Sequence, residues 1–263
     1  YAAPIEPSLD VDRCQTVTSF MIISHKHKFI FIHLSHTSGR SLTMDLLEHC
    51  GPEDIITPTG DYAGQNCDGW TRHMAAYEVK QRVGDEIWNS YYTFCMERNP
   101  WDKVTSNYWY KRGYKHKESR AAERVHFIER VMRNCVGYPW SLKTWLRYRL
   151  LKNKFSSARR PKLPRGSYWF TDLQGNIIVD SILRYEHRAD HVQQLADRLN
   201  LTLKESAQEG RKTRKTNRDY TAEYDDWSRE VIQDFFSVDL AALNYQFGES
   251  APTDIVELHG KNI

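Results

Sequence analysis

The residues best suited to chemistry form a short polar loop that follows an apolar run. Phe29 to Leu34 is apolar except for His33, which predicts a buried strand. The loop itself carries hydroxyl, imidazole and guanidinium groups on Ser35, His36, Thr37, Ser38, Gly39, Arg40 and Ser41. Apolar residues at helical spacing follow, from Leu42 to Leu47. A strand, a polar turn and a helix N-terminus can hold an anion, because backbone N–H groups and the helix dipole point toward it.

This loop differs from the Walker A motif of many nucleotide-binding proteins. That motif has two glycines separated by about four residues, then Lys and Ser or Thr. Here Gly39 is the one glycine of the loop, and the loop has no lysine. Arg40 supplies the fixed positive charge, and the hydroxyl groups add donors. The loop therefore suits phosphate binding, with an ordinary strand-to-helix turn as the alternative.

The length and composition are those of one α/β domain. The chain has 263 residues, of which 40% are hydrophobic and 27% are charged, enough for a sizeable core. We expect an irregular arm over residues 1–20, a single domain over residues 21–250 and a tail over residues 251–263. No apolar run reaches the ~18 residues of a membrane span, and we expect no signal peptide.

The cysteines at positions 14, 50, 67, 95 and 135 form no Cys-x-x-Cys pair and lack the spacing of a zinc site. Their odd number favours a reducing compartment. A cytoplasmic location is therefore preferred, with the Golgi lumen as the alternative. The net charge is +3, but every charged residue from Arg130 to Arg165 is basic. This stretch suits an anionic partner, and a solvated basic face balanced by the acidic C-terminal part is the alternative.

Strand patterns alternate with helix patterns along the chain, which predicts an α/β fold with a parallel sheet. The expected strands are residues 22–34 (as one strand or two around residues 25–28), 91–96, 168–171, 177–180 and 183–185. The expected helices are residues 41–49, 74–83, 101–112, 120–134, 141–151, 191–199 and 225–236. Asp172 to Asn176 is expected to form a hairpin turn between two of the strands.

A second apolar run also ends in a charged turn that leads into a helix. Tyr91 to Met96 is followed by Glu97-Arg-Asn-Pro100, a sequence that breaks a strand. Arg98 lies at the end of this strand, and Ser106 lies within the next helix. Both side chains can reach one phosphate, because a guanidinium bonds it in a bidentate way and a hydroxyl adds a donor.

The two loops resemble those of the carbohydrate-type sulfotransferases, which transfer a sulfuryl group from 3′-phosphoadenosine-5′-phosphosulfate (PAPS). The first family loop reads Phe-Ile-His-Ile-Pro-Lys-Thr-Gly-Gly-Thr-Ser, and this chain has Phe31-Ile-His-Leu-Ser-His-Thr-Ser-Gly-Arg-Ser41. The second reads Val-Arg-Asn-Pro-(Trp/Tyr)-Asp-Arg-x-x-Ser, and this chain has Glu97-Arg-Asn-Pro-Trp-Asp-Lys-Val-Thr-Ser106. Residues 72–74, 172–186, 215–224 and 239–247 resemble further family blocks in the same order, so the resemblance covers residues 29–247.

The resemblance implies a P-loop-like, three-layer α/β core with a central parallel sheet flanked by helices. It implies PAPS as the cofactor, adenosine 3′,5′-bisphosphate as the product, and no metal. The loop Ser35 to Ser41 would hold the 5′-phosphosulfate, while Arg98 and Ser106 would hold the 3′-phosphate. Arg211 and Arg214, in a basic stretch, would close over the cofactor.

In-line sulfuryl transfer needs a general base at the acceptor hydroxyl and cationic donors at the leaving oxygen. His73 is the candidate base, because the ordinary histidine pKa of about 6.5 suits proton abstraction. Glu78 and Asp102 are alternatives, although we expect Asp102 to cap its helix. The family has a lysine where this chain has His36. We expect His36 and Arg40 to share its role, with an impaired enzyme as the alternative.

Glu97 replaces an apolar family residue, and we expect it to form a structural ion pair with Arg98 or a neighbouring lysine. Tyr110 and other aromatic residues near the basic stretch suit a sugar ring or an anionic glycan, but we assign most of these aromatic residues to core packing. The expected function is transfer to a hydroxyl group, with a carbohydrate as the preferred acceptor. Alternatives are a non-carbohydrate small-molecule acceptor and a catalytically silent PAPS- or nucleotide-binding protein. A small-molecule kinase and a nucleic-acid-binding protein rank lower.

Overall fold

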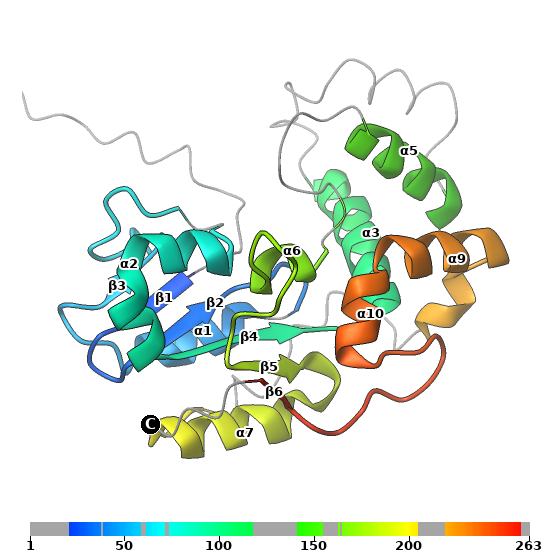
Figure 1. Cartoon of the computed structure of the whole chain (residues 1–263). Coiled ribbons are helices and arrows are strands. Elements are labelled where there is room, and N and C mark those ends of the chain that lie inside the picture. Colours follow the sequence, from blue (N-terminus) through cyan, green and yellow to red (C-terminus); the bar gives the residue numbers. More distant parts are fainter. Residues whose placement is uncertain are drawn as a thin grey trace, which may run out of the picture.

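The computed structural model describes residues 21–37, 39–58, 62–71, 74–117, 141–154, 163, 165–204 and 219–258. Within these residues six strands form one open, mixed sheet that is flanked by helices (Figure 1). Its strands, in chain order, are β1 (Met21–Ser24), β2 (Phe29–Ile32), β3 (Ile55–Ile56), β4 (Tyr92–Glu97), β5 (Ser181–Arg184) and β6 (Val256–Glu257). The predicted α/β class is therefore confirmed.

The sheet is parallel only at its centre. Its spatial order is β3-β1-β2-β4-β5-β6, with β2, β4 and β5 parallel to one another. The outer pairs β1–β2, β1–β3 and β5–β6 are antiparallel. The central strands are buried at every position, as expected for parallel strands covered on both faces, and their buried sequences are mainly apolar. Strand β6 comes from the segment that the sequence suggested was a tail.

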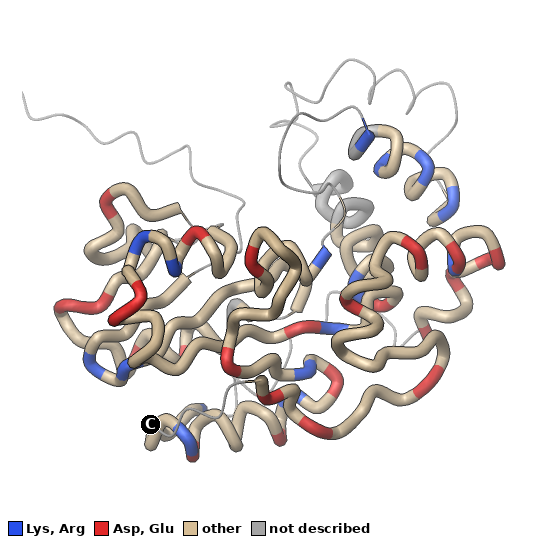
Figure 2. Tube along the Cα trace, in the orientation of Figure 1, with Lys and Arg blue, Asp and Glu red and all other residues tan. Residues whose placement is uncertain are grey.

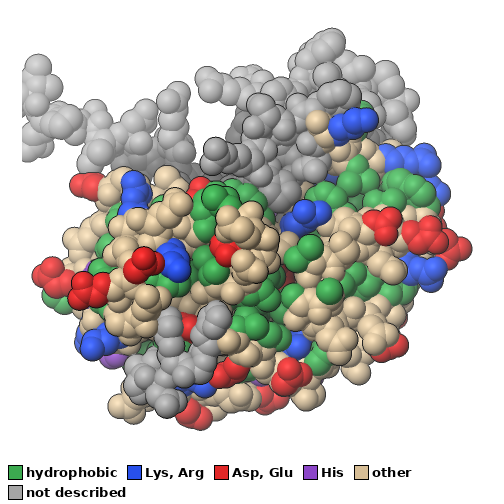
Figure 3. All heavy atoms as spheres, in the orientation of Figure 1, with side chains coloured by type: hydrophobic (Ala, Val, Ile, Leu, Met, Phe, Trp, Pro, Cys, Tyr) green, Lys and Arg blue, Asp and Glu red, His purple; other side chains and the backbone are tan. Residues whose placement is uncertain are grey.

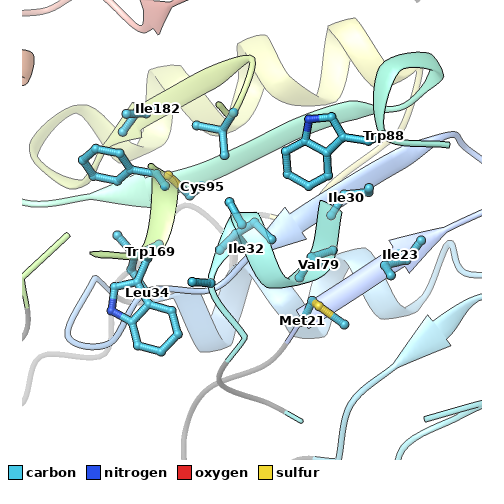
Figure 4. Packing of buried hydrophobic residues seen from close by; sticks show 14 of the residues in the cluster. Met21, Ile23, Ile30, Ile32, Leu34, Val79, Trp88, Cys95, Trp169 and Ile182 are labelled. Atoms are coloured by element: carbon cyan, nitrogen blue, oxygen red, sulfur yellow. The ribbon is translucent and has the colours of Figure 1, made fainter. Parts of the chain in front are cut away.

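Helices cover both faces of the sheet. The described helices are α1 (Gly39–Leu47), α2 (Ala76–Ser90), α3 (Pro100–Lys117), α5 (Leu142–Lys154), α6 (Ser167–Phe170), α7 (Arg188–Leu199), α9 (Asp226–Phe235) and α10 (Ser237–Leu243), with 3-10 turns η2 (Tyr185–His187) and η3 (Tyr220–Glu223). On one face α2 and α6 bury Val79, Trp88 and Trp169 in a cluster that also holds Ile30, Ile32 and Leu34 (Figure 4). On the other face α1 and α7 pack Leu42 and Val192 against strand residues. Among these helices none has the length and apolar character to cross a membrane.

A third apolar cluster lies where α3, α5 and α9 pack together. Trp101, Tyr108, Trp145 and Ile232 are buried there, so core packing accounts for these aromatic side chains. Lys and Arg positions, blue in Figure 2, lie along α5. The face drawn in Figure 3 also shows basic side chains over this helix. Lys143 of α5 donates to Asp225 at 2.6 Å. Acidic groups of the C-terminal part thus neutralise some of the basic stretch.

Many predicted elements are confirmed within a few residues, including the two short strands around His25–Lys28 and the turn over Asp172–Asn176. The strand predicted over residues 177–180 is wrong, because only the single bridge between Thr171 and Ile177 forms there and β5 begins at Ser181. The strand predicted over residues 168–171 is wrong, because Ser167–Phe170 is a single helical turn. Asp239 accepts bonds from the Ser167 N–H and hydroxyl, both at 2.8 Å, and holds this turn in place. Tertiary bonding thus overrides the β-preference of the aromatic residues. The helix predicted over residues 120–134 lies outside the described residues.

The turn between β1 and β2 is built around one buried carboxylate. Asp54 accepts bonds from the Ser24 hydroxyl at 2.7 Å and from the N–H groups of His25, Lys26 and Gly51 at 2.7–3.0 Å. Burial by itself raises the pKa of Asp54, but these donors outweigh it and hold the pKa below its ordinary value. The same turn also bonds the end of α1, because Lys26 Nζ donates to the carbonyl of His49 at 2.9 Å.

Replacing Asp54 with Asn should destabilise the fold, since the amide accepts at only one of its two positions. We expect the free energy of unfolding in urea to fall by about 2–4 kcal/mol. The loss should shrink as the pH falls through the depressed pKa of Asp54, where the wild-type carboxyl becomes protonated. Asp172→Asn is the matched control, because that carboxylate accepts local bonds in the Asp172–Asn176 turn. An equal effect of the two substitutions would contradict this account.

Candidate nucleotide-binding site

The carboxyl ends of the three parallel strands meet at one edge of the sheet. The register pairs Ile32 of β2 with Cys95 of β4, and Glu97 of β4 with Arg184 of β5. The loops that follow these strands therefore start side by side, and α3 leads away from β4 (Figure 1). In α/β sheets ligands bind outside the carboxyl ends of the strands, so this edge is the candidate site.

The loop after β2 has a constrained backbone, and its last residue packs closely against the His33 ring. Thr37 is buried and donates its hydroxyl to the Leu34 carbonyl at 2.8 Å. His36 has a φ of 66°, a left-handed conformation that non-glycine residues seldom adopt. At Gly39, where α1 begins, an added Cβ would lie 2.1 Å from His33 Cδ2. Glycine is thus required here because the buried His33 ring occupies the space of a side chain.

The same loop contacts α3 through two rings. The centroids of the His36 and Tyr110 rings lie 5.6 Å apart in an edge-to-face arrangement. Tyr110 lies four residues after Ser106, which lies four after Asp102, so the three share one face of α3. Arg98 lies just before α3 and joins these residues through its bond to Asp102. We call Arg98, Asp102, Ser106 and Tyr110 the α3 row, and the ring contact brings one end of it to the loop.

Arg98 is held firmly within the α3 row. Its Nε donates to Asp102 Oδ2 at 2.6 Å, and its Nη2 forms an ion pair with the same carboxylate. Its guanidinium carbon lies 4.1 Å from the centroid of the Tyr185 ring. The predicted capping role of Asp102 is taken by Asn99, whose Oδ1 accepts the Trp101 N–H at 3.1 Å. Asp102 instead orients Arg98.

A carboxylate from the turn η2, which follows β5, fixes the start of α3. Glu186 Oε1 accepts the Asn99 N–H at 2.8 Å, and its Oε2 accepts the Tyr245 hydroxyl at 2.9 Å. Arg184 donates to the carbonyls of Leu243 and Asp254. The loops after β4 and β5 are thereby bonded to each other and to the C-terminal segment.

Glu97 forms the predicted structural ion pair. It pairs with Lys103 at 2.7 Å, and each side chain is only 1% exposed. Glu97 also accepts the Arg98 N–H at 2.7 Å. Burial raises the pKa of Glu97 to about 7, Lys103 lowers it, and nearby Asp239 raises it. At Gly166 an added Cβ would lie 1.7 Å from Glu97 Oε2, so glycine is needed beside this buried carboxylate.

The structure describes some of the predicted site residues and not others. Ser35, His36, Thr37, Gly39 and Ser41 lie in the loop or in the first turn of α1, next to the α3 row that holds Arg98 and Ser106. The positions outside the described residues are Ser38, His73, Arg211, Arg214 and the side chain of Arg40.

One predicted alternative base has another role. Glu78 accepts the Ala75 N–H at 2.8 Å and caps the start of α2. The Glu78 carboxylate therefore serves as a helix cap, in the manner of a capping box.

Sequence reasoning missed two contributors to this edge. Tyr110 was one of several aromatic residues assigned mostly to core packing, yet its ring contacts His36. Arg188, at the start of α7, donates Nη2 to the Ser41 hydroxyl at 2.7 Å. Arg188 lies 147 residues from Ser41, so local sequence patterns carried no signal for this contact.

Comparison with known proteins adds little to this geometry. No family model and no solved structure matches the chain. A stretch of 40 residues, 15% of the chain, is 50% identical to a protein described as uncharacterized from Archaeoglobus fulgidus, and it spans 33% of that protein. Within the described residues no group of three or more His, Cys, Asp or Glu side chains is placed to hold a metal ion.

The raised pKa of Glu97 makes a prediction about stability and pH. A carboxyl with a folded pKa of about 7, above its ordinary value of 4.5, binds more protons in the folded state. Its stabilising contribution is complete below the unfolded pKa and is lost as the pH rises through the folded pKa. We expect the stability of the wild type relative to Glu97→Gln to fall by about 1–3 kcal/mol from pH ~5 to pH ~8.

Urea unfolding of both proteins across this pH range measures the difference. Exposed Glu249 provides the control substitution, Glu249→Gln, which should show no such trend. A wild-type advantage over Glu97→Gln that stays constant with pH would show that Glu97 is charged throughout this range.

Proposed function

We propose that this chain is a PAPS-dependent sulfotransferase that acts on a hydroxyl group, with a carbohydrate as the preferred acceptor. The observation that carries the proposal is the contact of His36 with Tyr110. It puts the polar loop after β2 beside the α3 row, and both segments resemble nucleotide-binding segments of these enzymes. A P-loop-like core and the product adenosine 3′,5′-bisphosphate belong to the same proposal.

The donor set at this edge fits a nucleotide with two phosphate positions. The N–H groups of the loop and of the α1 N-terminus suit the 5′-phosphosulfate. Arg98, just before α3, and the buried hydroxyl of Ser106 within α3 suit the 3′-phosphate. These are cationic and hydroxyl donors, which bind phosphate without a metal ion.

When bound, PAPS supplies the sulfuryl group for in-line transfer to the acceptor. Negative charge then develops on the leaving oxygen, where a donor is most valuable. His36 would donate a ring N–H there, and Arg40 would add its charge. His73 would take the proton of the acceptor hydroxyl as general base. His36 and Arg40 thus replace the lysine of the family loop.

One observation favours a second candidate, a nucleotide-binding protein that does not catalyse transfer. The His36 ring packs against Tyr110, and a histidine held in this way can serve to shape the loop. A neutral imidazole donates one hydrogen bond, whereas a lysine carries three N–H donors and a fixed charge. Binding of the nucleotide is common to both candidates, and the transfer step separates them.

Arg98 should be required for nucleotide binding. We expect Arg98→Ala to weaken adenosine 3′,5′-bisphosphate about 10- to 100-fold, because a charge-assisted bond to phosphate is lost. Arg98→Lys keeps the charge but not the planar fork, so its affinity should be intermediate. Isothermal titration calorimetry measures each affinity, with ATP as the competing ligand.

The matched control is Arg229→Ala on α9, an arginine whose side chain is 42% exposed and pairs with Asp226. This substitution should leave the affinity unchanged. Wild-type protein that binds ATP and ignores adenosine 3′,5′-bisphosphate would favour a kinase and overturn the proposal.

Transfer of labelled sulfate from PAPS to a panel of hydroxyl acceptors tests the catalytic step. We expect His36→Ala and Arg40→Ala each to lower turnover about 100-fold or more while changing PAPS affinity much less, because their donors act on charge that develops in the transition state. His36→Lys, which restores the family residue, should retain more activity than His36→Ala. Unchanged turnover in both alanine variants would show that neither side chain stabilises the leaving oxygen in place of the family lysine.

A further inference from the structure

Arg188 is a buried cation next to the first turn of α1. It begins α7 and is only 4% exposed. Its Nη2 donates to Ser41 Oγ at 2.7 Å, which connects α7 to the loop after β2. Neither loop motif contains Arg188. The tertiary fold brings it to the edge of the sheet where the loops after β2 and β4 begin.

The guanidinium stays protonated despite its burial. Burial lowers the pKa of Arg188 to about 10, while Tyr185 and Asp45 raise it. This value lies well above neutral pH, so Arg188 carries its charge under physiological conditions. Asp45 lies one turn after Ser41 on α1 and is itself buried. A buried charge of this kind is costly to the fold unless other groups compensate it, and Asp45 supplies part of that compensation.

The bond to Ser41 also sets the direction of the hydroxyl. Because Ser41 Oγ accepts the Arg188 N–H, the hydroxyl hydrogen of Ser41 must point away from the guanidinium. Ser41 thereby acts as a donor in the first turn of α1, where the helix dipole already favours an anion. The charged guanidinium of Arg188 is bonded to this hydroxyl and strengthens it as a donor.

We propose that Arg188 is a positioning residue of the nucleotide site, which orients Ser41 and adds a buried positive charge next to the loop, where the family lysine is replaced by His36. This inference rests on the proposed function. It commits to a phosphate-bearing ligand at the first turn of α1. A role in stability alone, as a bond between α7 and α1, is the competing explanation.

A double-mutant cycle separates the two explanations. We expect Arg188→Gln and Ser41→Ala each to weaken adenosine 3′,5′-bisphosphate binding about 10-fold or more. The double variant should lose little beyond the larger single effect, because both residues act through one bond. Arg188→Lys keeps the charge but cannot reproduce the planar fork, so it should bind with intermediate affinity. Calorimetry gives the affinities, and thermal unfolding without ligand gives the stability of each variant.

Arg198→Gln is the matched control, because Arg198 lies on the same helix and pairs with Glu257 at 2.7 Å. Its nucleotide affinity should equal that of the wild type. Arg188 and Ser41 variants that bind within twofold of a binding-competent wild type would overturn this inference alone. A wild type that binds no adenosine 3′,5′-bisphosphate would overturn the proposed function and this inference with it. If Arg188→Gln does not fold, an unchanged affinity of Ser41→Ala is sufficient to reject the positioning role.

Discussion

The parallel pairing of β2 with β4 is the constraint on which the rest of the candidate site depends. Because the two strands run side by side, their carboxyl ends deliver two loops to one edge of the sheet. The first loop ends at Gly39, where the His33 ring leaves no room for a side chain. The second carries Arg98 and leads into α3, which holds the rest of the α3 row. A change in this pairing would separate the two groups of donors that form the proposed anion site.

Buried polar bonds then hold the loops at fixed positions. Glu97, the residue before Arg98, pairs with Lys103 inside the protein. Glu186 accepts bonds from Asn99 and Tyr245, so the loop after β4 is fixed by the loop after β5. Buried charges contribute little to stability by themselves, since their desolvation offsets much of their attraction. Their value here is geometric, because they fix the direction in which Arg98 leaves the strand.

The features predicted from sequence are those with a local pattern. The apolar runs of β2 and β4 and the polar turns after them were predicted because strand, turn and helix signals follow one another within a few residues. The segment 168–171 was assigned wrongly, since an aromatic run does not separate a strand from a helical turn fixed by Asp239. Arg188 and Tyr110 could not be placed, because their contacts with the loop depend on how distant segments pack.

Amide hydrogen exchange, with and without adenosine 3′,5′-bisphosphate, tests the central claim that the two loops form one nucleotide site. The account predicts slower exchange in both residues 33–41 and residues 98–106 when the nucleotide is bound, because N–H groups and side chains of both segments contact it. Slower exchange confined to other parts of the chain, such as the β1–β2 turn at the opposite end of the sheet, would contradict it.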